Sequence, residues 1–141
     1  MSSHRIRLAG PWEWQAVAEG EQVSDVREPQ TCRLPFPAGL GSPVSGGILL
    51  RRGFHRPTGI AAGTSVVIVV EVVNCVPEVW LNGQILSCTS GNGAAGMPQP
   101  WRFDVSELMK SFNELRVRLM PAGSDSQPSL HAAALEIREQ P

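Results

Sequence analysis

The sequence predicts an all-β protein, an antiparallel β-sandwich built from short strands and long irregular connections. Residues 66–73 read VVIVVEVV, apolar at both alternating sets of positions except at Glu71, which is typical of an interior strand covered on both faces. Asn82-Gly83 separates two apolar segments, and this pair suits the two positive φ angles of a type I′ hairpin turn. Fourteen Gly and 12 Pro fit a protein with many turns.

The remaining elements follow from local patterns along the chain. Trp12 and Trp14 fall on one face of an alternating segment. Asp104 followed by Glu107 is a capping pattern, so one helical turn is expected over Val105–Met109, with Asp104 accepting from the backbone N–H of residue 106 or 107. The expected strands are Arg5–Leu8, Trp12–Val17, Thr31–Leu34, Ile48–Arg56, Val66–Val73, Glu78–Leu81, Gln84–Ser87, Glu114–Leu119 and Ala132–Arg138.

Length and charge limit the classes of protein and of partner that this sequence fits. A chain of 141 residues fits a single domain spanning 1–141. Its 12 basic and 13 acidic residues form no block of one sign, so we expect neither nucleic acid nor a membrane surface as a partner. No apolar segment approaches the ~20 residues that cross a bilayer. The N-terminus lacks the apolar segment of a secretory signal, so a cytoplasmic location is expected.

Four motifs occur in a fixed order along the chain: L-x-G-x-W at residues 8–12, LLRRGF at Leu49–Phe54, EVWLNG at Glu78–Gly83 and FDVSELMKSFNELRVRL at Phe103–Leu119. Together they resemble the N-terminal sugar-binding domain of glycoside hydrolase family 2 enzymes, and the resemblance covers nearly the whole chain. It implies a jelly-roll β-sandwich of the galactose-binding-like type. The family's catalytic carboxylates lie in a separate (β/α)₈ barrel, so the resemblance implies a non-catalytic chain with no catalytic residue to carry over. In the full enzymes this domain often packs against the barrel rather than holding sugar alone.

Two motifs that resemble known sites are better explained by local structure. Gly91–Gly96 fits G-x-G-x-x-G, but a dinucleotide site needs a helix next, and prolines at 98 and 100 prevent one. We therefore expect a flexible loop and no cofactor. Asn113-Glu114 is similar to the Asn-Glu pair that carries the acid/base in such hydrolases. It lies between a turn and an alternating strand, so a turn role is expected.

Cysteines and histidines indicate no metal site. Cys32, Cys75 and Cys88 form no C-x-x-C pair and are an odd number, so neither a disulfide framework nor a zinc site is expected. Buried thiols that stay reduced are the expected state. The three histidines are isolated, with no partner four residues away.

The tryptophans are the main candidates for ligand contact, because aromatic rings stack on the C–H faces of sugars. Core packing is the favoured role for Trp12 and Trp14. Packing is also the favoured role for Trp80, which faces Ile85 across the hairpin on the face opposite Val79, Leu81 and Leu86. The best candidate for a ligand platform is Trp101. The predicted ligand-binding residues are Trp101, Arg102 and Asn92, at the loop before residue 101.

Two function classes remain open. The first is a non-catalytic carbohydrate-binding module, accessory to a glycosidase on another chain. The alternative is a structural or protein-interaction β-sandwich that binds a protein partner or itself and takes no sugar. Arg51, Arg52 and Arg56 fit either class, because arginines bond to sugar hydroxyls, form a solvated face or bond to loop carbonyls.

Overall fold

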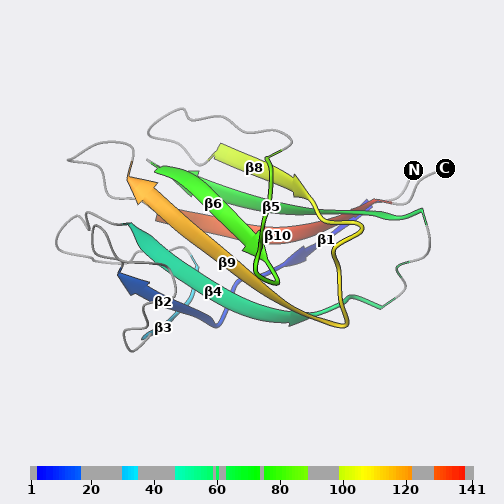
Figure 1. The fold of residues 1–141 in the computed structure, drawn as a ribbon, viewed down its shortest axis with the longest axis horizontal. Coiled ribbons are helices and arrows are strands. Elements are labelled where there is room, and N and C mark those ends of the chain that lie inside the picture. The colour runs from blue at the N-terminus through cyan, green and yellow to red at the C-terminus, as the bar shows by residue number, and fades with distance from the viewer. Residues whose placement is uncertain are drawn as a thin grey trace.

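Two antiparallel sheets pack face to face in the computed structural model of this protein (Figure 1). The structure describes residues 3–16, 30–34, 47–58, 60, 63–73, 75–88, 99–121 and 129–138. These residues contain ten strands and no helix. The predicted antiparallel β-sandwich is therefore confirmed.

The smaller sheet contains the apolar segment that led the sequence prediction. Its strand order is β1-β10-β5-β8. The strands span Ser3–Arg7 (β1), Ser129–Arg138 (β10), Ser65–Val73 (β5) and Gln99–Asp104 (β8). β5 lies between two neighbours, as an interior strand must. Val66, Ile68, Val70 and Val72 are buried in the core, and Val69 is buried on the opposite face.

The larger sheet has the order β3-β2-β4-β9-β6-β7. Its strands span Gln30–Cys32 (β3), Trp12–Ala16 (β2), Ile48–His55 (β4), Phe112–Pro121 (β9), Cys75–Leu81 (β6) and Gln84–Ile85 (β7). Alternate side chains of β9, namely Leu115, Val117 and Leu119, are fully buried against the other sheet. Trp12 is fully buried and Trp14 packs against the same core, so the shared core face predicted for this pair is confirmed.

The hairpin between β6 and β7 has the predicted turn. Asn82 has a φ of 53° and Gly83 a φ of 83°, and Leu81 pairs with Gln84 and Trp80 with Ile85. Both central φ angles are positive, as the type I′ geometry requires. The register inferred from the Asn-Gly pair is confirmed.

Replacing Gly83 with valine is expected to lower the free energy of unfolding by about 1–2 kcal/mol, because a β-branched residue resists positive φ. A Cβ at Gly83 would meet no atom within 4 Å, so the cost comes from the backbone and not from a clash. Gly83→Asn is the matched control, because asparagine tolerates this region. Urea denaturation measures both variants, and equal stability of the two would contradict a positive φ at residue 83.

The segment after β8 corrects one detail of the sequence prediction. Asp104 Oδ1 accepts from the Ser106 backbone N at 3.0 Å, as predicted for a cap. The expected helical turn over Val105–Met109 is instead a short turn at residues 106–108, closed by one bond from Leu108 N to Val105 O at 2.9 Å. The helix does not form because the Lys110 N donates to the Asn113 side chain rather than to a carbonyl one turn earlier.

Asn113 joins this turn to the hairpin. Its side chain is fully buried, and its Oδ1 accepts from Lys110 N at 2.9 Å and from Asn82 Nδ2 at 3.1 Å. Its Nδ2 donates to Lys110 O at 2.9 Å. Asn82 Oδ1 in turn accepts from Glu114 N at 2.8 Å. The structural role predicted for Asn113 is confirmed.

Candidate functional site

The outer face of the larger sheet brings together polar side chains from distant parts of the sequence. Along β2, β4 and β9 the alternate residues that do not enter the core point outward. The strand register places Glu13 opposite Arg51, Arg51 opposite Arg116, and Gly53 opposite Glu114. Residues about 40 to 65 positions apart thus become cross-strand neighbours on one surface.

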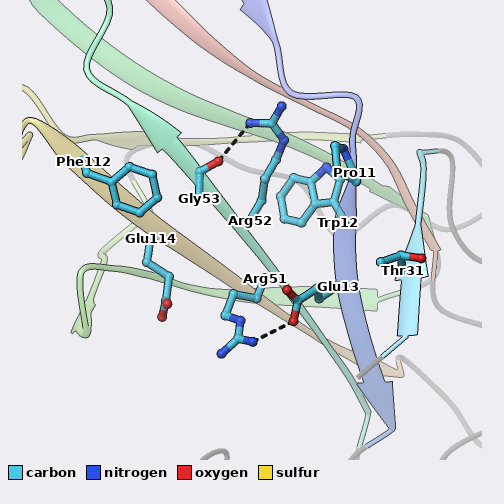
Figure 2. Close-up of a pocket in the computed structure, with 9 residues that line it drawn as sticks. All are labelled: Pro11, Trp12, Glu13, Thr31, Arg51, Arg52, Gly53, Phe112 and Glu114. Atoms are coloured by element: carbon cyan, nitrogen blue, oxygen red, sulfur yellow. Dashed lines mark hydrogen bonds and ion pairs between the residues drawn. The ribbon is translucent and has the colours of Figure 1, made fainter. Parts of the chain in front are cut away.

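A hollow of about 430 Å³ opens at this face, between the ends of β2, β3, β4 and β9 (Figure 2). The residues that line it on the outer face include Glu13, Thr31, Arg51, Phe112 and Glu114. One exposed aromatic ring therefore lies among charged and hydroxyl groups. This mixture of apolar surface and a few polar groups is typical of small-molecule sites.

Phe112 is the aromatic side of the hollow, and 55% of its surface is exposed. Its ring lies over Gly53 of the neighbouring strand, where an added Cβ would come within 2.5 Å of Phe112 Cζ. His55 contacts the ring edge-on, with the ring centroids 5.1 Å apart and an interplanar angle of 69°. The absence of a side chain at Gly53 therefore lets the ring rest on the sheet.

Both carboxylates of the hollow are paired with arginines. Glu13 Oε2 accepts from Arg51 Nη2 at 2.7 Å, and this hydrogen bond raises the pKa of Arg51. Glu114 Oε1 accepts from Arg116 Nε at 2.6 Å. Short bonds of this kind hold the two carboxylates as hydrogen-bond acceptors.

Arg52 differs from these arginines in its surroundings. Its Nη1 donates to Gly53 O and its Nη2 to Gly10 O, both at 3.3 Å. Its Nε is buried without a hydrogen-bond partner, and burial lowers the pKa of the guanidinium. Within the described residues no carboxylate forms an ion pair with Arg52. Arg52 is paired with the buried Leu115, so its side chain points to the side of β4 opposite that of Arg51 and Phe112 (Figure 2).

Two of the residues predicted for ligand binding, Trp101 and Arg102, lie on the other sheet. Trp101 is on the inner face of β8, opposite Val70, where it packs against the core, and its Nε1 is buried without a partner. Arg102 is on the outer face of the same strand, with its Nε 3.8 Å from Glu136 Oε1. Asn92 lies outside the described residues. Adjacent residues of a strand point to opposite faces, so Trp101 and Arg102 do not meet at one surface. Their role in ligand binding stays a prediction.

The sequence prediction did not include Phe112, Glu13, Glu114 or Gly53 in a site. The sequence did contain one pattern that indicates an outward position for Phe112. Extending the alternation of residues 114–119 back by two positions puts Phe112 on the outward side, together with Glu114 and Arg116. A large apolar residue at an outward position next to charged ones is a candidate for ligand contact.

The cysteines are only partly as expected. Cys32 is half-buried and free, and burial raises the pKa of its thiol. Cys88 is exposed, so its expected burial is wrong, because the pairing of β7 with β6 ends at Ile85. The side chain of Cys75 lies outside the described part of the structure. Among the described residues, no three His, Cys, Asp or Glu side chains are grouped so that they could hold a metal ion.

The described residues also contain no helix long and apolar enough to span a bilayer.

The fold is similar to parts of solved glycosidases. A β-glucuronidase from Bifidobacterium dentium, solved with coumarin-3-O-glucuronide, matches 97% of this chain at 17% identity with a TM-score of 0.69. A β-glucuronidase from Faecalibacterium prausnitzii matches 98% at 15% identity, with the same TM-score of 0.69. A putative β-galactosidase from Bacteroides fragilis matches 99% at 16% identity with a TM-score of 0.68.

The match covers only 30%, 32% and 24% of those three chains. This chain therefore has the fold of one part of much longer enzymes. No protein-family profile matches the sequence. No curated protein sequence matches it either.

Proposed function

We propose that this chain is a single, non-catalytic carbohydrate-binding domain, accessory to a glycosidase, and that the hollow beside Phe112 is its sugar site. One observation carries the proposal. An aromatic ring that is 55% exposed is fixed by Gly53 and His55 at the edge of a 430 Å³ hollow lined by charged and hydroxyl side chains. The likeness of the fold to parts of β-glucuronidases and a β-galactosidase supports the same class of ligand.

The chemistry of the lining suits a pyranose. A sugar has C–H groups on the faces of its ring, which pack on an aromatic ring, and hydroxyls at the periphery, which need donors and acceptors. Phe112 supplies the apolar surface. Glu13, Thr31 and Arg51 supply acceptors and donors within the same hollow. The Glu13–Arg51 pair is held at 2.7 Å before a ligand arrives, so less side-chain freedom is lost on binding.

The state of the carboxylates supports a binding role over a catalytic one. Glycoside hydrolysis needs one carboxylic acid that donates a proton and a second carboxylate that acts as nucleophile or base. Glu13 and Glu114 both accept hydrogen bonds from guanidinium groups, which is the role of an ionised group rather than of a proton donor. We therefore expect no turnover of chromogenic β-glucuronides or β-galactosides.

Phe112→Ala is expected to weaken sugar binding about tenfold, because aromatic contacts of this kind contribute ~0.5–1.5 kcal/mol beyond the area they bury. The measurement is an NMR titration of the ¹⁵N-labelled protein with methyl β-glucosides, β-galactosides and β-glucuronides. Ile85→Ala is the matched control. Ile85 is 59% exposed on the same sheet but lies outside the hollow, so its removal should leave the affinity unchanged.

Two further variants test where on the protein the sugar binds. Gly53→Ala keeps Phe112 but moves its ring, so binding should weaken while the fold persists, because the clash falls on the end of a side chain. Trp101→Ala tests the site predicted at Trp101, Arg102 and Asn92. Binding that survives Phe112→Ala but is lost in Trp101→Ala would place the sugar at that second site.

A protein-interaction role is the second candidate, and exposed apolar side chains on β6 and β7 favour it. Ile85 and Val76 are 59% and 47% exposed, on the outer face that also carries Trp80. Failure of every sugar to bind, together with concentration-dependent broadening of the Val76 and Ile85 methyl signals, would support this alternative.

A further inference from the structure

The outer face of the larger sheet carries a second aromatic side chain beyond the hollow. Trp80 lies on β6, opposite Arg116 of β9 and Ile85 of β7. Its neighbours Val79 and Leu81 are buried in the core, so the Trp80 side chain points outward, and it is partly buried. Ile85 beside it is 59% exposed. Trp80 therefore belongs to the same outer surface as Phe112.

The two aromatic rings lie within reach of one extended ligand. Phe112 and Arg116 are four residues apart on β9 and both point outward, and Trp80 lies opposite Arg116 on the adjacent strand (Figure 1). At ~3.4 Å per residue along a strand and ~4.8 Å between strands, the backbones of Phe112 and Trp80 are about 14 Å apart. A single pyranose on Phe112 does not reach Trp80, whereas a short chain of linked pyranoses does.

The groups between the two rings are polar and already ordered. Glu114 and Arg116 point outward from β9 between Phe112 and Trp80, and Arg116 Nε donates to Glu114 Oε1 at 2.6 Å. Their side chains are 39% and 32% exposed. The bond uses one N–H of Arg116 and one oxygen of Glu114, so further donors and acceptors of the pair can meet a ligand. Sugar hydroxyls both donate and accept hydrogen bonds, so they match this pair.

A charged pair between two aromatic rings favours a sugar chain over a protein partner. The core of a protein interface is depleted of charged residues. A sugar chain instead presents ring faces to aromatic side chains and hydroxyls to the polar groups between them. A β-1,4-linked chain is extended, whereas an α-1,4-linked chain coils, so the extended kind fits two rings on one sheet face.

We propose that the sugar site of the hollow continues along β9 to Trp80, and that its ligand is an extended, β-1,4-linked oligosaccharide or polysaccharide rather than a single sugar. The inference rests on the proposed sugar binding at Phe112 and adds the length and shape of the ligand. Phe112 and Trp80 each hold one ring of the chain, and the Glu114–Arg116 pair bonds to hydroxyls of the units between them.

The test titrates the wild-type protein with sugars of increasing length, followed by NMR. The β-1,4-linked glucose and galactose series run from the methyl glycoside to the tetramer, and α-1,4-linked maltotetraose tests the shape of the chain. In the series that binds, we expect the tetramer to bind about tenfold more tightly than the methyl glycoside, because a second aromatic contact is added on the same chain. Maltotetraose should show no such gain. The indole N–H signal of Trp80 should shift with the tetramer and not with the methyl glycoside.

Variants then locate the second contact. Trp80→Ala should remove the gain with chain length and leave the affinity for the methyl glycoside within about twofold, whereas Phe112→Ala should weaken both. Val76→Ala is the matched control. Val76 is 47% exposed on the same face of β6 but lies opposite Met120, four residues beyond Trp80, so its affinities should match the wild type. Thermal melts confirm that each variant is folded, and the length series on the wild type needs no variant at all.

The outcomes separate this inference from the proposed function. Equal affinity for the methyl glycoside and the tetramer would overturn the inference and leave the sugar site standing. A gain with length that survives Trp80→Ala would overturn the path to Trp80, and an equal gain with maltotetraose would overturn the extended shape. Binding of no sugar would overturn both proposals, and self-association through Val76 and Ile85 would then assign this face to a protein partner.

Discussion

Trp12→Ala is expected to lower the free energy of unfolding by about 3–5 kcal/mol, the range for removing a buried tryptophan or phenylalanine. Trp12 is the largest of the fully buried side chains and lies in the core between the two sheets. Its Nε1 donates to Leu8 O at 2.7 Å and so ties β2 to the residue that follows β1. Removal of the side chain leaves a cavity and an acceptor without its partner, because the surrounding strands cannot collapse fully.

Trp12→Phe separates these two contributions. Phenylalanine keeps most of the packing and removes the donor, so a smaller loss of about 1–3 kcal/mol is expected. Urea denaturation followed by circular dichroism measures both variants. Trp14→Ala serves as a comparison, since Trp14 is only partly buried against the same core. A loss below 1 kcal/mol in Trp12→Ala would contradict a central place for Trp12 in the core.

Asn113→Ala is expected to cost about 3 kcal/mol, which is a fall of about 10 °C in Tm for a domain of this size. The substitution leaves Lys110 N and Lys110 O without their side-chain partner at 2.9 Å each, and also removes the acceptor of Asn82 Nδ2. An unsatisfied buried polar group costs ~1–3 kcal/mol, so the loss of several together exceeds an ordinary surface substitution.

Asn113→Asp is the matched control for this network. Aspartate keeps an acceptor for Lys110 N but cannot donate to Lys110 O, and it adds a buried charge. We expect it to be destabilised as well, and to recover part of its stability at low pH, where the protonated acid can donate. A Tm of Asn113→Ala within 2 °C of the wild type would show that the two turns hold their shape without the amide.

The Asn113 network and the hollow share one strand. Asn113 points into the core at the start of β9, and its neighbours Phe112 and Glu114 point outward into the hollow. The bonds that hold Asn113 therefore also fix the position of the ring and the carboxylate proposed to contact sugar. Loss of Asn113 should weaken sugar binding even in the fraction of the protein that stays folded.

Local patterns in the sequence determined the strands and the hairpin. The alternation of residues 114–119 and the double-sided apolar run at 66–73 are properties of a few neighbouring residues, and each produced the strand it predicts. Asn82-Gly83 determined a turn in the same way, because positive φ is a property of single residues. The capping role of Asp104 followed from its sequence, whereas the helix after it did not form, since Asn113, nine residues away, takes the Lys110 N–H.

Only the tertiary structure determined which residues come together in the hollow. Phe112 is held by Gly53, Glu13 pairs with Arg51, and Arg52 reaches the carbonyl of Gly10, so each contact joins strands that are distant in the sequence. The register between β2, β4 and β9 sets these neighbours, and a shift of one residue would turn every side chain to the other face. The register of β9 against β4 turned Phe112 outward, and in the other sheet the register of β8 against β5 turned Trp101 inward. Register depends on how both sheets bury their apolar faces together, which no single segment of the chain specifies.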